Sequence, residues 1–146
     1  VVKALEDSEQ LLQATLDGNC EAVARGIDVA HDENTSILSY NNENSLACVL
    51  AIAYYYAKND YIVHREFATG KGFADLVLIP RKNVDSPAIV IELKYNHDAD
   101  TAISQIKRRQ YPAKVADYTG ELLLVGINYD RKEKKHQCQI VRYNKN

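Results

Sequence analysis

Apolar residues fall at helical spacing in the first third of the chain and in strand-like runs further on. The helical spacing predicts a first helix over Val2–Leu16, which the turn residues 17–19 end. A shorter helix is predicted over Glu21–Ile27, before a polar, loop-like stretch from Asp28 to Asn42. A third helix, Glu43–Lys58, is apolar nearly all round, which is typical of a helix buried against a sheet.

Runs rich in alternating and β-branched apolar residues predict a sheet in the rest of the chain. The expected elements are strands over Tyr61–Ala68, Leu76–Ile79 and Ala88–Tyr95, a helix between Asn96 and Pro112, and strands over Glu121–Asp130 and Gln137–Tyr143. Helices before and between the strands indicate an α/β fold in which helices flank a mixed central sheet.

Asp75 and Glu92 accompany two short apolar strands that follow each other in the sequence. If residues 81–86 close an antiparallel hairpin symmetrically, Asp75 lies opposite Glu92. Alternation along the second strand places Glu92 and Lys94 on one face of the sheet and Leu93 on the other. A bulge in the loop would shift the register by one residue and move one acid to the other face.

The two carboxylates need a compensating charge if they share a face of the sheet. Directly opposed side chains have Cβ atoms roughly 4.5 to 5.5 Å apart, where like charges repel. The strands are otherwise apolar on both faces, as central strands covered by helices are, and partly buried charges persist only when paired or metal-bound. The candidates for the compensating charge are therefore Lys94 and a hard divalent cation such as Mg²⁺.

The 146 residues fit one compact domain, and the net charge of −2 gives no overall basic field of the kind that marks a general nucleic-acid coater. Three cysteines far apart in the sequence predict a reduced, cytoplasmic setting. The longest apolar run, Leu46–Ala57, is too short for a membrane span, which takes roughly 20 residues. Because the chain starts at Val1 and contains no methionine, we expect it to be a segment of a longer protein.

Three stretches, in this order, carry a resemblance to a known family: GKGFADLVL, IVIELK and AISQIKRRQY. Together with LLLVGINY they resemble the PD-(D/E)XK nuclease superfamily, and most closely the nuclease-like domain at the C-terminus of bacterial AAA-ATPase-like proteins. The resemblance runs from about Glu43 to Tyr143, and Phe73 stands where the family often has arginine.

This resemblance implies a restriction-endonuclease-like fold with the core order α-β-β-β-α-β. The core would occupy residues 43–146, after a helical lead-in over residues 1–42, within a single nuclease-like domain. The implied activity is hydrolysis of DNA phosphodiesters that depends on Mg²⁺ or Mn²⁺. An AAA-ATPase-like domain would precede this one in the full-length protein.

By the same resemblance, the carboxylates of Asp75 and Glu92 would hold the catalytic cation, with the backbone carbonyl of Leu93 completing the shell. Lys94 would orient or activate the attacking water and stabilise the negative charge that develops. These roles suit phosphodiester hydrolysis, which needs a cation on the non-bridging oxygens, an oriented water and a stabilised leaving oxygen.

Three further residues match the family's pattern. Gln105 and Tyr111 match the helix-borne motif that helps to align the site or the nucleic-acid strand. Glu43 matches the acid on the first core helix. There it is either a further metal ligand or a first-turn carboxylate that complements the helix dipole.

Alternatives to the nuclease hypothesis stay open. The acids and Lys94 can also form a buried ion network in a catalytically inactive module that uses the same fold to bind nucleic acid or a protein partner. Several basic residues can either contact backbone phosphates or form ordinary solvated surface: Lys107, Arg108, Arg109, Arg131, Lys132, Lys134 and Lys135. The four histidines have no metal-ligand spacing, and we predict that they are ordinary surface or strand residues, His64 included.

Overall fold

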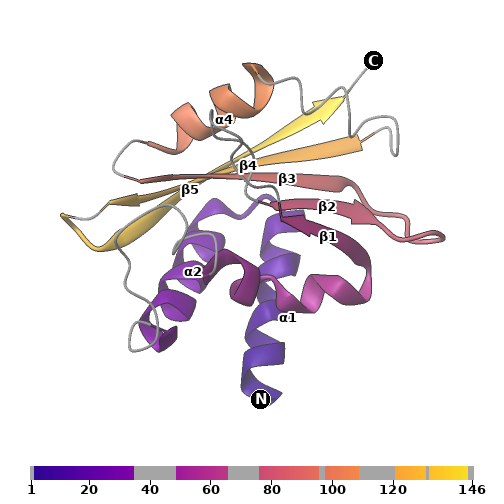
Figure 1. Cartoon of the computed structure of the whole chain (residues 1–146), viewed down its shortest axis with the longest axis horizontal. Coiled ribbons are helices and arrows are strands. Elements are labelled where there is room, and N and C mark those ends of the chain that lie inside the picture. The colour runs from indigo at the N-terminus through magenta and orange to yellow at the C-terminus, as the bar shows by residue number, and fades with distance from the viewer. Residues whose placement is uncertain are drawn as a thin grey trace.

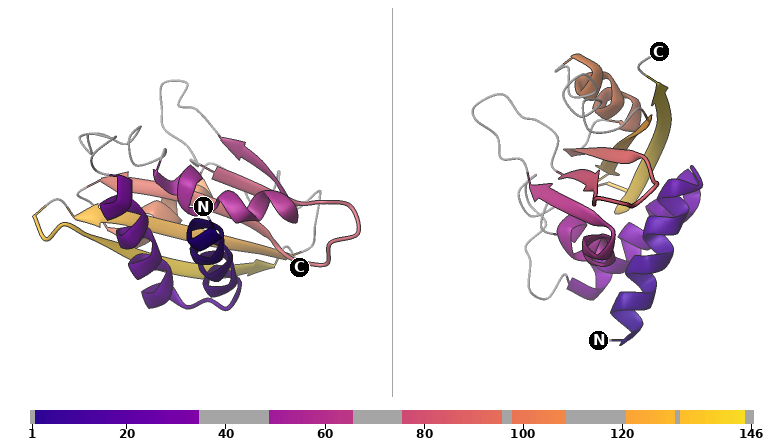
Figure 2. Two further views of the ribbon diagram at one scale, coloured as in Figure 1. Left: turned by 90° about the horizontal axis from the view of Figure 1, so that it is seen from below. Right: turned by 90° about the vertical axis from the view of Figure 1, so that its right-hand side faces the viewer.

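The computed structural model describes residues 2–34, 49–65, 76–95, 98–108, 121–130 and 132–144. Its centre is a five-stranded mixed sheet in the order β1-β2-β3-β4-β5 (Figure 1). The elements are α1 (Val2–Leu16), α2 (Cys20–Asn34), the 3₁₀ helix η1 (Tyr55–Asn59), β1 (Tyr61–Arg65), β2 (Leu76–Pro80), β3 (Ala88–Tyr95), α4 (Ala99–Arg108), β4 (Glu121–Asp130) and β5 (Lys135–Asn144). Helices α1 and α2 lie on one side of the sheet and α4 on the other (Figure 2). Among these elements, no helix is long and apolar enough to cross a membrane.

The pairing of β2 with β3 follows the predicted antiparallel hairpin. Leu76 lies opposite Ile91, Val77 opposite Val90 and Leu78 opposite Ile89, which is the register of a symmetrical loop without a bulge. Strand β3 then pairs in parallel with β4, and α4 makes the crossover between them. Two antiparallel edge strands, β1 and β5, complete the predicted mixed sheet.

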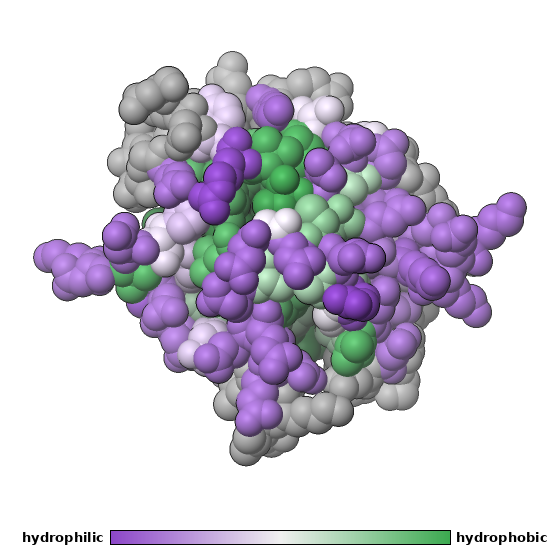
Figure 3. All heavy atoms as spheres, turned by 180° about the vertical axis from the view of Figure 1, so that it is seen from behind, coloured by the Kyte–Doolittle hydropathy of each residue, from purple (hydrophilic) through white to green (hydrophobic). Residues whose placement is uncertain are grey.

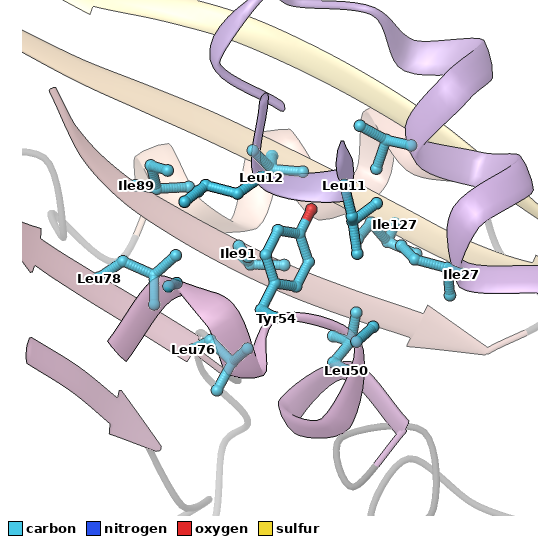
Figure 4. Packing of buried hydrophobic residues seen from close by; sticks show 14 of the residues in the cluster. Leu11, Leu12, Ile27, Leu50, Tyr54, Leu76, Leu78, Ile89, Ile91 and Ile127 are labelled. Atoms are coloured by element: carbon cyan, nitrogen blue, oxygen red, sulfur yellow. The ribbon is translucent and has the colours of Figure 1, made fainter. Parts of the chain in front are cut away.

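The larger hydrophobic core lies between the sheet and the first helices (Figure 4). Leu11 and Leu12 of α1 and Ile27 of α2 share one buried cluster with the inward-facing side chains of β2, β3 and β4. Tyr54 fills the space between helices and strands, and its hydroxyl hydrogen bonds to Thr15 Oγ1 at 2.8 Å. Burial raises the pKa of Tyr54 above its usual value, so this phenol stays neutral.

Helix α2 is longer than predicted, because it continues to Asn34 through the stretch expected to be a loop from Asp28 onward. Val23, Ile27 and His31 are four residues apart and all buried, so one helical face continues through polar sequence. Asp28 accepts a hydrogen bond from the backbone N–H of His136 at 2.8 Å. Asp28, one of the polar residues that suggested a loop, is therefore satisfied by its contact with β5.

The third helix also differs from its prediction. Residues 49–53 are helical, but the chain turns at Tyr54 and continues as η1 instead of an α-helix reaching Lys58, while the predicted start at Glu43 lies outside the described residues. Ser8 on α1 explains the change. Its hydroxyl donates to the carbonyl of Ala53 at 2.7 Å and accepts from the N–H of Tyr56 at 2.8 Å. These bonds replace the α-helical ladder at this point, and the N–H of Ala57 bonds to the Tyr54 carbonyl at 3.0 Å.

Helix α4 packs directly on the other face of the sheet. Ala102 and Ile103 are buried there against the sheet. Gly126 of β4 lies beneath the start of α4, where an added Cβ would overlap the carbonyl oxygen of Ala99 and lie 3.0 Å from the Cβ of Ala102. The absence of a side chain at Gly126 therefore lets the helix approach the sheet closely.

Candidate active site

Glu92 and Lys94 lie on the face of β3 that α4 covers. Val90, two residues earlier, belongs to the smaller buried cluster with Ile103 of α4, and alternation along the strand places Glu92 and Lys94 on the same face. Leu93 points the other way, into the cluster beneath α1 and α2. The predicted division of these side chains between the two faces is therefore confirmed.

The carboxylate of Glu92 and the ammonium of Lys94 form an ion pair inside the protein. Nζ of Lys94 is 3.9 Å from Oε1 of Glu92, and the two residues are 8% and 1% exposed. Removing charges from water costs several kcal/mol each, and their mutual attraction offsets only part of that cost. A contribution to stability therefore does not account for the two charges on this otherwise apolar central strand, and both residues are candidates for the site's chemistry.

Polar side chains continue this face across the next two strands. Gly126 of β4 is the partner of Glu92, and Asn128 is the partner of Lys94. Asn128 is 1% exposed and donates from Nδ2 to Oε1 of Gln137 on β5 at 3.2 Å. A row of polar groups thus runs from Lys94 to the edge strand of the sheet.

Sequence reasoning did not identify Asn128 and Gln137 as neighbours of the site. A signal was present, because Asn128 is a polar residue inside the apolar run of β4. Only the parallel pairing of β3 with β4 shows that this position lies beside Lys94. We therefore add Asn128 to the candidate site residues.

The other predicted site residues are not placed by the structure. Asp75 directly precedes β2 in the sequence, and it lies outside the described residues together with Glu43 and Tyr111. The backbone of Gln105 belongs to α4, on the site's side of the sheet, but its side chain is not described. Within the described residues, no group of three or more His, Cys, Asp and Glu side chains could hold a metal ion.

The carboxylate of Glu92 is the kind of oxygen ligand that a divalent cation such as Mg²⁺ prefers. Hard cations such as Mg²⁺ bind through one or two carboxylate oxygens and keep several waters, so a single buried acid can supply part of such a site. The burial of Glu92 would also strengthen its attraction to a cation, because little water screens the charges there.

Two histidines form a separate buried cluster on the opposite side of the sheet. Nδ1 of His136 lies 2.6 Å from Oδ1 of Asp28, and the rings of His31 and His136 both pack against Tyr129, with centroids 5.2 and 4.9 Å away. Burial, followed by the nearby His136, lowers the pKa of His31. The prediction of ordinary surface or strand histidines is therefore wrong for His31, which is buried in a helix, whereas His64 is exposed on β1.

Comparison with known proteins identifies the family. The sequence model of the PD-(D/E)XK nuclease superfamily matches residues 41–139 of the 146, a stretch that contains the Glu92–Lys94 pair, the whole of β1 to β4 and α4. No curated protein matches the chain significantly. The mixed sheet with helices on both faces is the restriction-endonuclease-like architecture predicted from the sequence. The chain therefore belongs to the PD-(D/E)XK nuclease superfamily.

Proposed function

We propose that this chain hydrolyses phosphodiester bonds of DNA in a reaction that depends on a divalent cation, Mg²⁺ or Mn²⁺. The observation that carries the proposal is the buried Glu92–Lys94 pair on the sheet face beneath α4. These residues would be the acid and lysine of the motif that gives the superfamily its name, and members of that superfamily are generally nucleases.

Glu92 and Asp75 would hold the cation, with the Leu93 carbonyl and Glu43 as further ligands. The support for Asp75 is the register of the hairpin, because the pairing of Leu76 with Ile91, continued by one residue, predicts Asp75 opposite Glu92. When bound, the cation would supply positive charge to the phosphoryl oxygens and lower the pKa of a bound water.

Lys94 would act on the attacking water and on the developing negative charge. Its ammonium lies beside Glu92 with little solvent around it, so its charge is weakly screened and held in one place. Asn128, the strand partner of Lys94 on β4, would limit the space into which the lysine can move. Gln105 and Tyr111 would align the nucleic-acid strand with these groups.

The finer biological setting is also a proposal that rests on the sequence resemblance. We infer a nuclease-like domain that follows an AAA-ATPase-like domain in a cytoplasmic bacterial protein. The motifs GKGFADLVL, IVIELK and AISQIKRRQY support it.

A cleavage assay with matched glutamate variants tests the proposed activity. We expect the wild-type chain to cleave plasmid or linear DNA in Mg²⁺ or Mn²⁺ but not in EDTA. Glu92→Gln should lose at least about a hundredfold in rate, on the order of 3 kcal/mol, because it removes the buried charge. Glu121→Gln is the control, since Glu121 is exposed on β4 and accepts a hydrogen bond from Nη1 of Arg142 at 2.7 Å.

Two results would contradict the proposal. Cleavage that persists undiminished in Glu92→Gln would place the active site elsewhere or reveal a contaminating nuclease. Binding of DNA without turnover, unchanged by metal, would instead identify a catalytically inactive module. RNA and branched DNA in the same assay would define the substrate class.

A further inference from the structure

The hairpin between β4 and β5 projects from one end of the sheet as a short, well-bonded turn (Figure 1). Oδ1 of Asp130 accepts the backbone N–H groups of Lys132 at 2.9 Å and Glu133 at 3.2 Å. The N–H of Lys134 donates to the Asp130 carbonyl at 2.7 Å. These three hydrogen bonds to Asp130 fix the backbone of the turn, so the Cα atoms that carry the side chains at its tip are held in defined positions.

Lys134 occupies a position that the turn alone does not favour for lysine. Its φ is 58°, in the left-handed region where glycine and asparagine are the usual residues. A lysine is less favourable there than glycine, because its Cβ lies too close to the following carbonyl oxygen. A residue that is unfavourable for the backbone, at an exposed tip, points to a use for its charge.

The charge at this tip is positive. Lys132, Lys134 and Lys135 are exposed, with Glu133 as the one acid among these four consecutive residues, whereas the whole chain has a net charge of −2. Figure 3 shows hydrophilic side chains extending from the end of the molecule where this hairpin lies. We call Lys132, Lys134 and Lys135 the basic hairpin.

The basic hairpin lies at the same end of the sheet as the candidate active site. Lys94 pairs with Asn128, and β4 ends only two residues later at Asp130, a distance of roughly 7 Å along the strand. Gln137 shares the site face, because its side chain bonds to Asn128. Lys135 comes two residues before Gln137 on β5, so alternation places it on that face as well.

We propose that the basic hairpin binds backbone phosphates of duplex DNA on one side of the bond to be cleaved. This inference rests on the proposed nuclease function, and it adds the surface that holds the substrate. Lysine ammonium groups bind phosphates without reading the base sequence, so the hairpin positions the duplex and does not select a sequence. Binding at this surface releases counterions and weakens steeply with salt.

Equilibrium binding in EDTA tests the proposal without requiring cleavage. A fluorescent duplex is titrated with protein between about 50 and 200 mM KCl, and the slope of log Kd against log salt is measured. Lys134→Asn should reduce the slope by about one, and the triple variant Lys132→Asn, Lys134→Asn, Lys135→Asn by nearly three. Kd rises as the salt concentration increases from about 50 to 200 mM. For each phosphate contact that is lost, this rise in Kd should be smaller by a factor of roughly 3.5.

The matched control is Lys82→Asn, in the exposed loop between β2 and β3 at the opposite end of β3. Lys134→Asn keeps a residue that tolerates positive φ, so it should unfold at the wild-type temperature or above it. An unchanged slope in the triple variant, an equal change in Lys82→Asn, or no DNA binding by the wild type overturns the inference. If the chain binds DNA through the basic hairpin but does not cleave it, the binding surface is supported and only the nuclease proposal is refuted.

Discussion

Lys94→Met is expected to lower the kcat of metal-dependent DNA cleavage by about a thousandfold, or roughly 4 kcal/mol of transition-state stabilisation. Methionine has a similar length and no charge, so it fills the buried space beside β4 while removing the ammonium that lies 3.9 Å from Glu92. A group that acts only on the water and the developing charge affects kcat more than KM.

Single-turnover cleavage of a labelled duplex measures this effect, with Lys82→Met as the control for loss of a surface lysine. Lys82 is exposed in the loop between β2 and β3, so its removal should leave the rate within about twofold. A Lys94→Met rate within tenfold of the wild type, in protein shown to be folded, would mean that Lys94 is only a structural partner of Glu92.

Gly126→Ala is expected to destabilise the fold by about 3 kcal/mol, a large share of the 5 to 15 kcal/mol typical of a domain. The new Cβ would overlap the carbonyl oxygen of Ala99, which is backbone at the start of α4 and cannot rotate away. Removing this overlap requires α4 to move away from β4. Because Gly126 pairs with Glu92, that movement would also disturb the candidate active site.

Urea denaturation of Gly126→Ala and Gly26→Ala separates this packing effect from a general glycine effect. At Gly26 the nearest atom to an added Cβ is Cδ1 of Leu11 at 2.9 Å, the far end of a flexible side chain. Alanine in a helix interior also gains up to about 1 kcal/mol over glycine, so Gly26→Ala should change stability little. Equal stability of the two variants would contradict the close packing of α4 on β4.

Local sequence patterns correctly predicted those elements whose structure depends on local geometry. Helix α1 spans Val2–Leu16 as predicted, and it ends where Gly18 adopts a φ of 73°. Strand β3 spans Ala88–Tyr95 as predicted, and its register with β2 followed from a symmetrical loop. The positions of Glu92 and Lys94 on one face were predictable for the same reason, since alternation along a strand is a local property.

Contacts between distant residues account for what the sequence could not predict. The extension of α2 depends on Asp28 and His31, whose partners on β4 and β5 are about a hundred residues away. The change from α to 3₁₀ helix after Ala53 depends on Ser8 of α1. The row from Lys94 through Asn128 to Gln137 follows from strand pairing, which no local pattern specifies.

The decisive measurement is a titration of Mn²⁺ into the folded chain, with free Mn²⁺ followed by electron paramagnetic resonance. A nuclease site at Glu92 predicts that the wild type and Glu121→Gln bind the ion equally. Glu92→Gln should bind at least about tenfold more weakly, because a neutral amide replaces a buried carboxylate ligand. A Glu92→Gln variant that binds Mn²⁺ as tightly as the wild type, or a wild type that binds none, would contradict a metal-dependent active site at this position.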